Sequence, residues 1–253
     1  MKKVFLGLLS GFNWLFYAFI PFILFPLQLL IFLSTFLFDR RLSMVHKFTS
    51  FWAWLLVRVN PLWKVKIYGK EKIDPRKAYV MISNHQSLLD ILVIFLLFVH
   101  FKWVAKIELF RMPIPGWVMS LNQYVKIDRG NKQSAQQMLD HCQRHLQNGS
   151  SVMIFPEGTR SEDGNLRKFK EGAFRLAKMA DVPILPIVVE GTANALPKNS
   201  FIIKNIQHIE VHVLDEIPAK TIKSMTPPFL ALYAKDLIEK KLNWLRSPEY
   251  NRN

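Results

Sequence analysis

This sequence has only one cysteine and none of the common glycine-rich loops. The single cysteine, Cys142, excludes an intramolecular disulfide and a cysteine-rich metal site. It falls on the apolar stripe of a predicted helix, so we interpret it as a small core residue. The GxGxxG and GxxxxGK(S/T) loops of nucleotide-binding proteins are missing, as is the GxSxG turn of many serine hydrolases. These absences argue against the corresponding classes of protein.

Charged residues are missing from residue 4 to residue 38. This run is longer than the roughly 20 residues that cross a bilayer core, and it fits a signal peptide poorly. Pro21 and Pro26 are expected to kink or break a helix there. The segment is therefore predicted to be one bent span, a re-entrant helix pair or an interfacial anchor. Basic residues flank both ends and leave the orientation open, with Lys2 and Lys3 before the run and Arg40, Arg41 and Lys47 after it.

Residues 42–59 form an amphipathic, aromatic helical pattern. Trp52 and Trp54 suit the depth of lipid headgroups, although a buried helix of a globular domain gives the same pattern. Because the preceding apolar run delivers this segment to the bilayer, we expect it to contact the membrane. We assign residues 1–62 to an N-terminal hydrophobic, helical membrane anchor.

Strand and helix patterns alternate after the break at Asn60-Pro61. Strands are predicted at 65–69, 78–83, 102–106, 122–129, 151–155, 184–189 and 208–214. Helices are predicted at 88–98, 133–148, 170–180 and 228–245, and 113–117 is expected to be a turn-rich linker. Residues 63–253 are therefore predicted to form an α/β layered domain, in which helices flank a mixed, partly parallel central sheet.

The charge balance indicates an anionic partner. The net charge is +15, with 34 Lys and Arg residues against 19 acidic ones. Nucleic acid, a membrane surface and a phosphorylated substrate all fit such an excess. Charge by itself does not choose among them.

The first polar island, SNHQSLLD at 83–90, follows a predicted strand and precedes a predicted helix. A chain that turns between His85 and Asp90 brings the carboxylate onto one imidazole nitrogen. The other nitrogen then accepts a proton from a substrate hydroxyl. A polar turn with a solvated histidine is the alternative interpretation. A metal site is weaker, because no second histidine lies at ligand spacing.

The second island, FPEGTRSEDG at 155–164, follows another predicted strand. Gly158 permits unusual backbone angles or a close approach of a ligand, and Thr159 offers a hydroxyl. Arg160 offers a planar fork that suits phosphate. A surface loop with a Glu157–Arg160 ion pair is the alternative.

Together these islands resemble the glycerolipid acyltransferase family. NHQSLLD matches the NHxxxxD pattern of that family, and FPEGTRS matches its second hallmark. The stretch at 103–131 looks like its acceptor-binding block, and VPILPIVVEGT at 182–192 resembles its fourth block. The resemblance covers roughly residues 65–192, with the blocks in the right order, and is strongest to the bacterial 1-acyl-glycerol-3-phosphate acyltransferases.

The resemblance implies a direct acyl transfer. His85 is the general base and Asp90 its orienting partner. The acyl group moves from acyl-CoA or acyl-carrier protein to the sn-2 hydroxyl of 1-acyl-glycerol 3-phosphate, giving phosphatidic acid. No acyl-enzyme, cofactor or metal is implied. Alternatives are another lyso-lipid acceptor, a membrane-bound lipid hydrolase, and a noncatalytic, basic lipid-binding protein.

The resemblance also implies where the substrates bind. Arg160 holds the acceptor phosphate with Lys106 and Arg129 as further cations, while Glu157, Gly158 and Thr159 shape the loop. The implied partners are a phospholipid bilayer, lysophosphatidic acid and the acyl donor, and not nucleic acid. The implied location is the bacterial inner membrane, with the catalytic domain on its cytoplasmic face.

Overall fold

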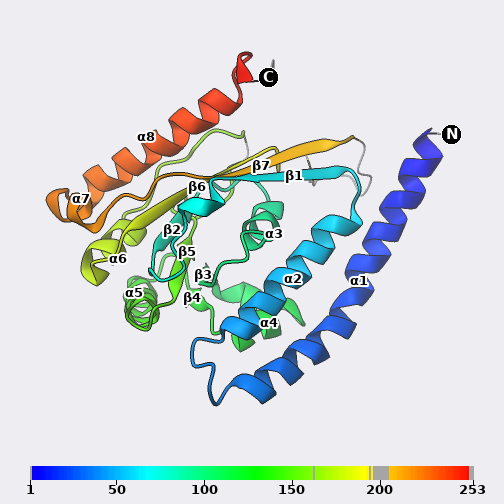
Figure 1. The fold of residues 1–253 in the computed structure, drawn as a ribbon, viewed down its shortest axis with the longest axis horizontal. Coiled ribbons are helices and arrows are strands. Elements are labelled where there is room, and N and C mark those ends of the chain that lie inside the picture. Colours follow the sequence, from blue (N-terminus) through cyan, green and yellow to red (C-terminus); the bar gives the residue numbers. More distant parts are fainter. Residues whose placement is uncertain (1, 162, 194, 196–204, 251–253) are drawn as a thin grey trace.

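The computed structural model describes residues 2–161, 163–193, 195 and 205–250 (Figure 1). Its helices are α1 (Lys2–Thr35), α2 (Ser43–Val59), α3 (Leu89–Phe95), α4 (Pro115–Leu121), α5 (Lys132–Gln147), α6 (Gly172–Ala180), α7 (Ala219–Ser224) and α8 (Pro227–Leu245). Short 3-10 helices are η1 (Lys70–Lys72) and η2 (Ile107–Arg111). The strands are β1 (Trp63–Tyr68), β2 (Val80–Ser83), β3 (Phe101–Lys106), β4 (Val125–Ile127), β5 (Ser151–Ile154), β6 (Ile184–Glu190) and β7 (Gln207–Val213).

The strands form one mixed sheet, which confirms the predicted fold class. Its order is β1-β7-β6-β2-β5-β3-β4. The five strands from β6 to β4 are parallel to one another. β7 runs antiparallel to β6, and β1 is parallel to β7. Across the sheet, strand direction therefore changes once, between β6 and β7.

The connections that leave β2 and β5 lie on opposite faces of the sheet. After β2 the chain enters α3, which packs in a core with Met81 and Met153. After β5 it enters α6, which packs in the other core with Val80 and Val152. Two adjacent parallel strands whose connections diverge in this way leave a crevice at their carboxyl ends. Both polar islands lie at that crevice.

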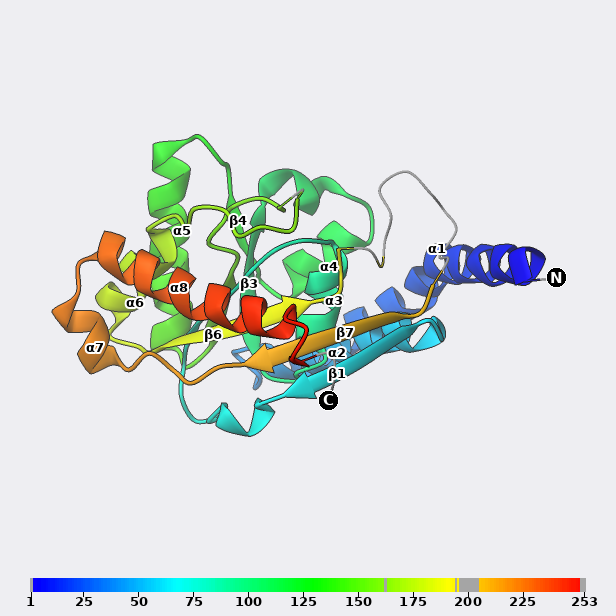
Figure 2. The same ribbon diagram turned by 90° about the horizontal axis from the view of Figure 1, so that it is seen from above.

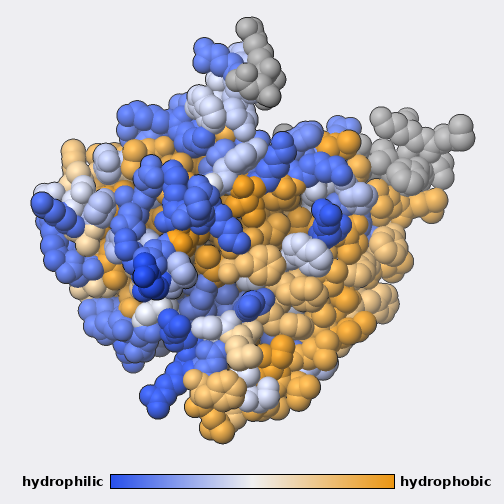
Figure 3. Space-filling view, in the orientation of Figure 1, coloured by the Kyte–Doolittle hydropathy of each residue, from blue (hydrophilic) through white to orange (hydrophobic). Residues whose placement is uncertain are grey.

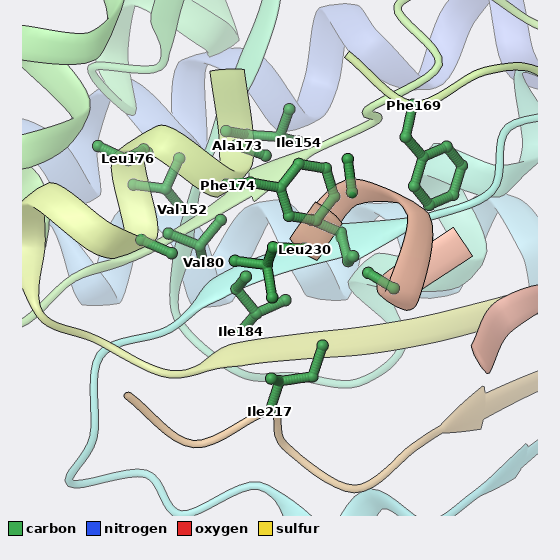
Figure 4. Packing of buried hydrophobic residues seen from close by; sticks show 14 of the residues in the cluster. Val80, Val152, Ile154, Phe169, Ala173, Phe174, Leu176, Ile184, Ile217 and Leu230 are labelled. Atoms are coloured by element: carbon green, nitrogen blue, oxygen red, sulfur yellow. The ribbon is translucent and has the colours of Figure 1, made fainter. Parts of the chain in front are cut away.

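Each face of the sheet buries its own hydrophobic core. Figure 4 shows the core beneath α6 and α8, where Phe174 and Leu230 meet the side chains of β2, β5 and β6. α2 and α3 cover the opposite face. Burial on both faces explains the uninterrupted apolar runs in β2, β5 and β6.

The N-terminal run forms one helix that bows but does not break (Figure 1). α1 continues through Pro21 and Pro26, so the expected break is wrong, and the bowing is the bend that internal prolines produce. Its second half lies against α2 and α4. In Figure 2 its N-terminal half projects past the rest of the domain.

α2 is integrated into the domain more deeply than its pattern indicated. Ala53 and Val57 belong to the core under the sheet. Trp52 is only 7% exposed and packs with Leu24, Ile114 and Val118, so its expected headgroup position is wrong. Trp54 is 38% exposed, and its expected headgroup position stays a prediction.

The segment between β3 and β4 also differs from expectation. The turn-rich linker at 113–117 includes the start of α4, whose first residue is Pro115. Proline fits the first helical turn, since the N–H it lacks has no helical partner there. The predicted strand at 122–129 shortens to β4, because Asn122 ends α4 and Gln123 adopts a φ of 53°.

Candidate active site

The turn after β2 is fixed to the end of β6 by a side-chain amide. Asn84 Nδ2 donates to Val189 O at 2.7 Å, and Val189 N donates to Asn84 Oδ1 at 2.9 Å. Asn84 is 1% exposed. These paired bonds extend the β2–β6 ladder by one side chain and place the next residue, His85, above the crevice.

His85 and Asp90 form the expected pair. His85 Nδ1 lies 2.8 Å from Asp90 Oδ2. The same oxygen accepts from the backbone N–H of Gln86 at 2.6 Å and of Ser87 at 2.9 Å, while Thr192 Oγ1 donates to Asp90 Oδ1. Asp90 is fully buried. Because Oδ2 already accepts from two backbone N–H groups, it faces the ring as an acceptor, and Nδ1 of His85 is the donor in this contact.

The other imidazole nitrogen is left to accept a proton. Within the described part of the chain, Nε2 of His85 has no hydrogen-bond partner. The ring stacks on Phe155, with centroids 3.8 Å apart and planes 8° apart, and Phe155 in turn stacks on Trp103 at 5.3 Å. His85 is 9% exposed. The imidazole is therefore held between the Asp90 carboxylate and the Phe155 ring.

Glu157 joins the two polar islands. Its Oε1 accepts from the backbone N–H of His85 at 2.8 Å, and its Oε2 accepts from that of Arg167 at 3.0 Å. Burial raises the pKa of Glu157, while these two backbone donors lower it. Ser161 N also donates to His85 O at 2.8 Å. The Glu157–Arg160 ion pair of the alternative interpretation is absent among the described contacts, because both carboxylate oxygens of Glu157 bond to backbone.

Gly158 allows a lysine to lie across the loop. Its φ is +73°, and a Cβ placed there would come within 2.8 Å of Lys170 Nζ. Thr159 and Arg160 are exposed. Among the described residues the Arg160 guanidinium has no partner, while its carbonyl accepts from Arg167 at 3.3 Å. The loop thus presents free positive charge beside His85.

Lys106 and Arg129 lie at the ends of neighbouring parallel strands and share an acidic neighbour. Lys106 Nζ pairs with Glu108 Oε1 at 2.9 Å. Burial lowers the pKa of Arg129, and the carboxylate of Glu108 opposes that shift. Sequence reasoning missed Glu108, although the Lys106-Ile107-Glu108 spacing is a signal for such a pair.

Three further residues, Asn84, Gln86 and Thr192, lie inside the motifs, but sequence reasoning gave them no role in the site. Thr192 lies inside the resembling block at 182–192, and it reaches Asp90 because β6 is the neighbour of β2. Gly191 precedes it with a φ of +85°, where a Cβ would collide with the carbonyl oxygen of His208. Only the strand order reveals this contact, since 102 residues separate Thr192 from Asp90.

The residues of the site do not form a metal centre. In the described ranges, no three His, Cys, Asp or Glu side chains are grouped to hold a metal ion. A cavity of about 650 Å³ lies between α5 and the segment from η2 to β4. Neither polar island lines this cavity.

The His85 imidazole is thus oriented by a buried carboxylate and joined to an exposed, positively charged loop at the edge of a mixed α/β sheet. The sequence profile of the acyltransferase family, described as "Acyltransferase", matches residues 64–190. The chain therefore belongs to the acyltransferase family.

Curated relatives of this chain are also named as acyltransferases. The chain is 37% identical over 183 residues to a chloroplastic 1-acyl-sn-glycerol-3-phosphate acyltransferase of Brassica napus, covering 72% of this chain and 52% of that one. It is 38% identical over 176 residues to a chloroplastic enzyme of the same name from Arabidopsis thaliana, covering 69% and 49%. The chain thus spans about half the length of the curated relatives it matches.

A solved structure shares the fold along nearly the whole chain. It is the 1-acyl-sn-glycerophosphate acyltransferase PlsC from Thermotoga maritima. The TM-score is 0.81 at 22% identity, with 98% of each chain covered. At this identity the likeness establishes the fold.

Proposed function

We propose that this protein transfers a fatty acyl group from an acyl thioester to the sn-2 hydroxyl of 1-acyl-glycerol 3-phosphate, giving phosphatidic acid. The observation that carries the proposal is the His85 ring, with Nδ1 bonded to buried Asp90 and Nε2 unbonded among the described residues. The names of the curated relatives support the acceptor. Acyl-CoA or acyl-carrier protein supplies the acyl group.

The reaction needs no covalent enzyme intermediate. Nε2 of His85 takes the proton from the acceptor hydroxyl as that oxygen attacks the thioester carbonyl. Asp90 stabilises the imidazolium that forms. When the tetrahedral oxyanion collapses, the carbon–sulfur bond breaks and the thiolate receives the proton from Nε2. A base with an orienting acid and no activated nucleophile suits this route.

Arg160 is proposed to bind the acceptor phosphate. Its guanidinium is exposed and has no partner among the described residues, and Ser161 joins the loop to His85. Thr159, Gly158 and Glu157 set the shape of the loop. Lys106 and Arg129 are proposed as additional cations, of which Lys106 must first leave Glu108.

We also propose that residues 1–62 anchor the α/β domain to a membrane. Gly7–Thr35 is long and apolar enough to cross a bilayer, and its side chains are mostly exposed. Figure 3 shows apolar surface gathered over the side that α1 and α2 occupy in Figure 1. Because α1 packs along α2 and α4, an arrangement in the interface of one leaflet fits better than a free span. The proposed site is the cytoplasmic face of the bacterial inner membrane.

Flotation of the intact chain with phospholipid vesicles tests the anchor. The protein is expected to float with the vesicles at high salt, since apolar burial rather than charge holds it. Release by salt alone would show that the basic surface, and not α1, makes the contact.

Acyl transfer by the purified protein tests the activity. Acyl-CoA and acyl-carrier protein donors are crossed with a panel of lyso-lipid acceptors, and thiol and diacyl products are measured. Wild-type protein is expected to form phosphatidic acid, and folded His85→Ala protein none. Free fatty acid without diacyl product would identify a hydrolase. Binding of lipid without thiol release, unchanged in His85→Ala, would identify a lipid-binding protein.

A further inference from the structure

Arg246, just after α8, bonds to the loop after β5 and to the end of β6. Its Nη1 donates to Gly164 O at 3.0 Å, and its Nη2 donates to Glu190 Oε2 at 2.7 Å. Gly164 belongs to the loop after β5, and Glu190 is the last residue of β6. One guanidinium therefore spans two segments that come from different parts of the chain.

The bond from Arg246 to Glu190 connects Arg246 to the turn that holds His85. Glu190 Oε2 also lies 3.4 Å from Gln86 Nε2, which donates to Val189 O at 3.1 Å. The backbone N–H of Gln86 donates to Asp90 Oδ2 at 2.6 Å. Glu190 thus contacts the side chain of Gln86, whose backbone N–H donates to the same Asp90 oxygen as His85 Nδ1.

The bond from Arg246 to Gly164 connects Arg246 to the loop that carries Arg160. Gly164 lies between Asp163 and Asn165, and the Asp163 carboxylate accepts from Ser161 Oγ at 2.8 Å and from Asn165 N at 3.0 Å. Ser161 follows Arg160 and donates its backbone N–H to His85 O at 2.8 Å. The carbonyl that Arg246 holds is therefore part of the turn that presents Arg160.

We propose that Arg246 is a positioning residue for acyl transfer, which keeps the Arg160 loop in register with the His85–Asp90 pair. The proposal rests on the proposed function. Arginine suits this role because its planar fork donates to two acceptors in fixed directions, which a lysine ammonium does not do. α8 provides a firm support, since Ile238, Leu242 and Leu245 are buried in the core.

The test compares Arg246→Lys, Arg246→Ala and Glu190→Gln with wild type, using kcat and KM for thiol release. Lys240→Ala is the matched control, because Lys240 lies on α8 and, among the described residues, its ion pair is with exposed Asp236 at 2.7 Å. Arg246→Ala is expected to lower kcat/KM about tenfold. Arg246→Lys keeps the charge near Glu190, so it is expected to raise the acceptor KM while kcat is largely retained. Lys240→Ala is expected to match wild type.

A readout without catalysis separates the positioning role from the activity. Amide hydrogen exchange at Ser161 and Arg167 reports the bonds to His85 O and Glu157 Oε2. Exchange there is expected to quicken in Arg246→Ala and to remain unchanged in Lys240→Ala, with α8 equally protected in both. Unchanged exchange and kcat/KM within about twofold of wild type would overturn the proposal. Inactive wild-type protein would instead refute the proposed function, and the exchange result would still decide the role of Arg246.

Discussion

Replacing Asp90 with asparagine isolates the charge of the His85–Asp90 pair from its geometry. Asp90 Oδ2 faces three donors, from His85, Gln86 and Ser87. An asparagine oxygen takes that position, and its amide nitrogen then faces the Thr192 hydroxyl, which also accepts hydrogen bonds. The side chain thus fits without a rearrangement, and Nδ1 of His85 still donates to an oxygen. What disappears is the negative charge beside the imidazolium of the transition state.

The size of the effect follows from that charge. Unit charges about 4 Å apart interact by about 4 kcal/mol at an effective dielectric constant of about 20. The loss of 4 kcal/mol from the transition state lowers the rate by about a thousandfold. Asp90→Asn is therefore expected to reduce kcat about a thousandfold while the folded structure persists. Thiol release from acyl-CoA measures the rate, and the melting temperature checks the fold.

Two comparisons make this prediction refutable. Thr192→Val removes one neutral donor and keeps the charge, so it is expected to lower kcat by no more than about tenfold. In a His85→Ala background, Asp90→Asn is expected to cause no further loss, because the charge acts through the imidazolium. A folded Asp90→Asn protein that retains more than about a tenth of wild-type kcat would refute the electrostatic role of Asp90.

Two further predictions concern phosphate recognition and acid stability. Arg160→Ala is expected to raise the KM for a phosphorylated acceptor about tenfold or more, and equal loss with an acceptor lacking phosphate would contradict the phosphate role. Burial, with Lys102 and Arg41 nearby, lowers the pKa of His100 to about 3, although the carboxylate of Asp39 opposes this shift. Because the unfolded histidine titrates near 6.5, its stabilising contribution is present above that pH and is lost as pH falls towards 3. The melting temperature is expected to drop below about pH 6.5, and less so in His100→Gln; an equal drop in both would assign the sensitivity to other groups.

The sequence predicts the repeating parts of the fold well, because burial leaves a local pattern. Apolar runs locate β2, β5 and β6, and helical periodicity locates α5 and α8 within a residue or two. A local sequence pattern does not determine the order of the strands in the sheet. The position of β5 between β2 and β3, and the reversed direction of β7, depend on pairings between segments far apart in the chain.

The predictions that were wrong have the same physical cause, because they also depend on contacts between segments far apart in the chain. Pro115 signals a turn as strongly as a helix start, and only the packing of α4 against α1 and η2 decides between them. Trp52 suits a membrane interface as well as a core, and its contacts with α1 and α4 place it in the core. In the active site, motif residues could be predicted from the chain, whereas Thr192 and Arg246 are found only after the sheet brings distant ends together.

The position of Glu157 between the two loops limits how the two motifs can change independently. Its carboxylate bonds to the backbone of His85, which is 72 residues away, and to that of Arg167 in its own loop. A substitution that reshapes either loop alters the support of the other, whatever side chains are conserved at the surface. Loops grafted from a relative to change the acceptor lipid will therefore have to be exchanged as a pair, with the glutamate that couples them.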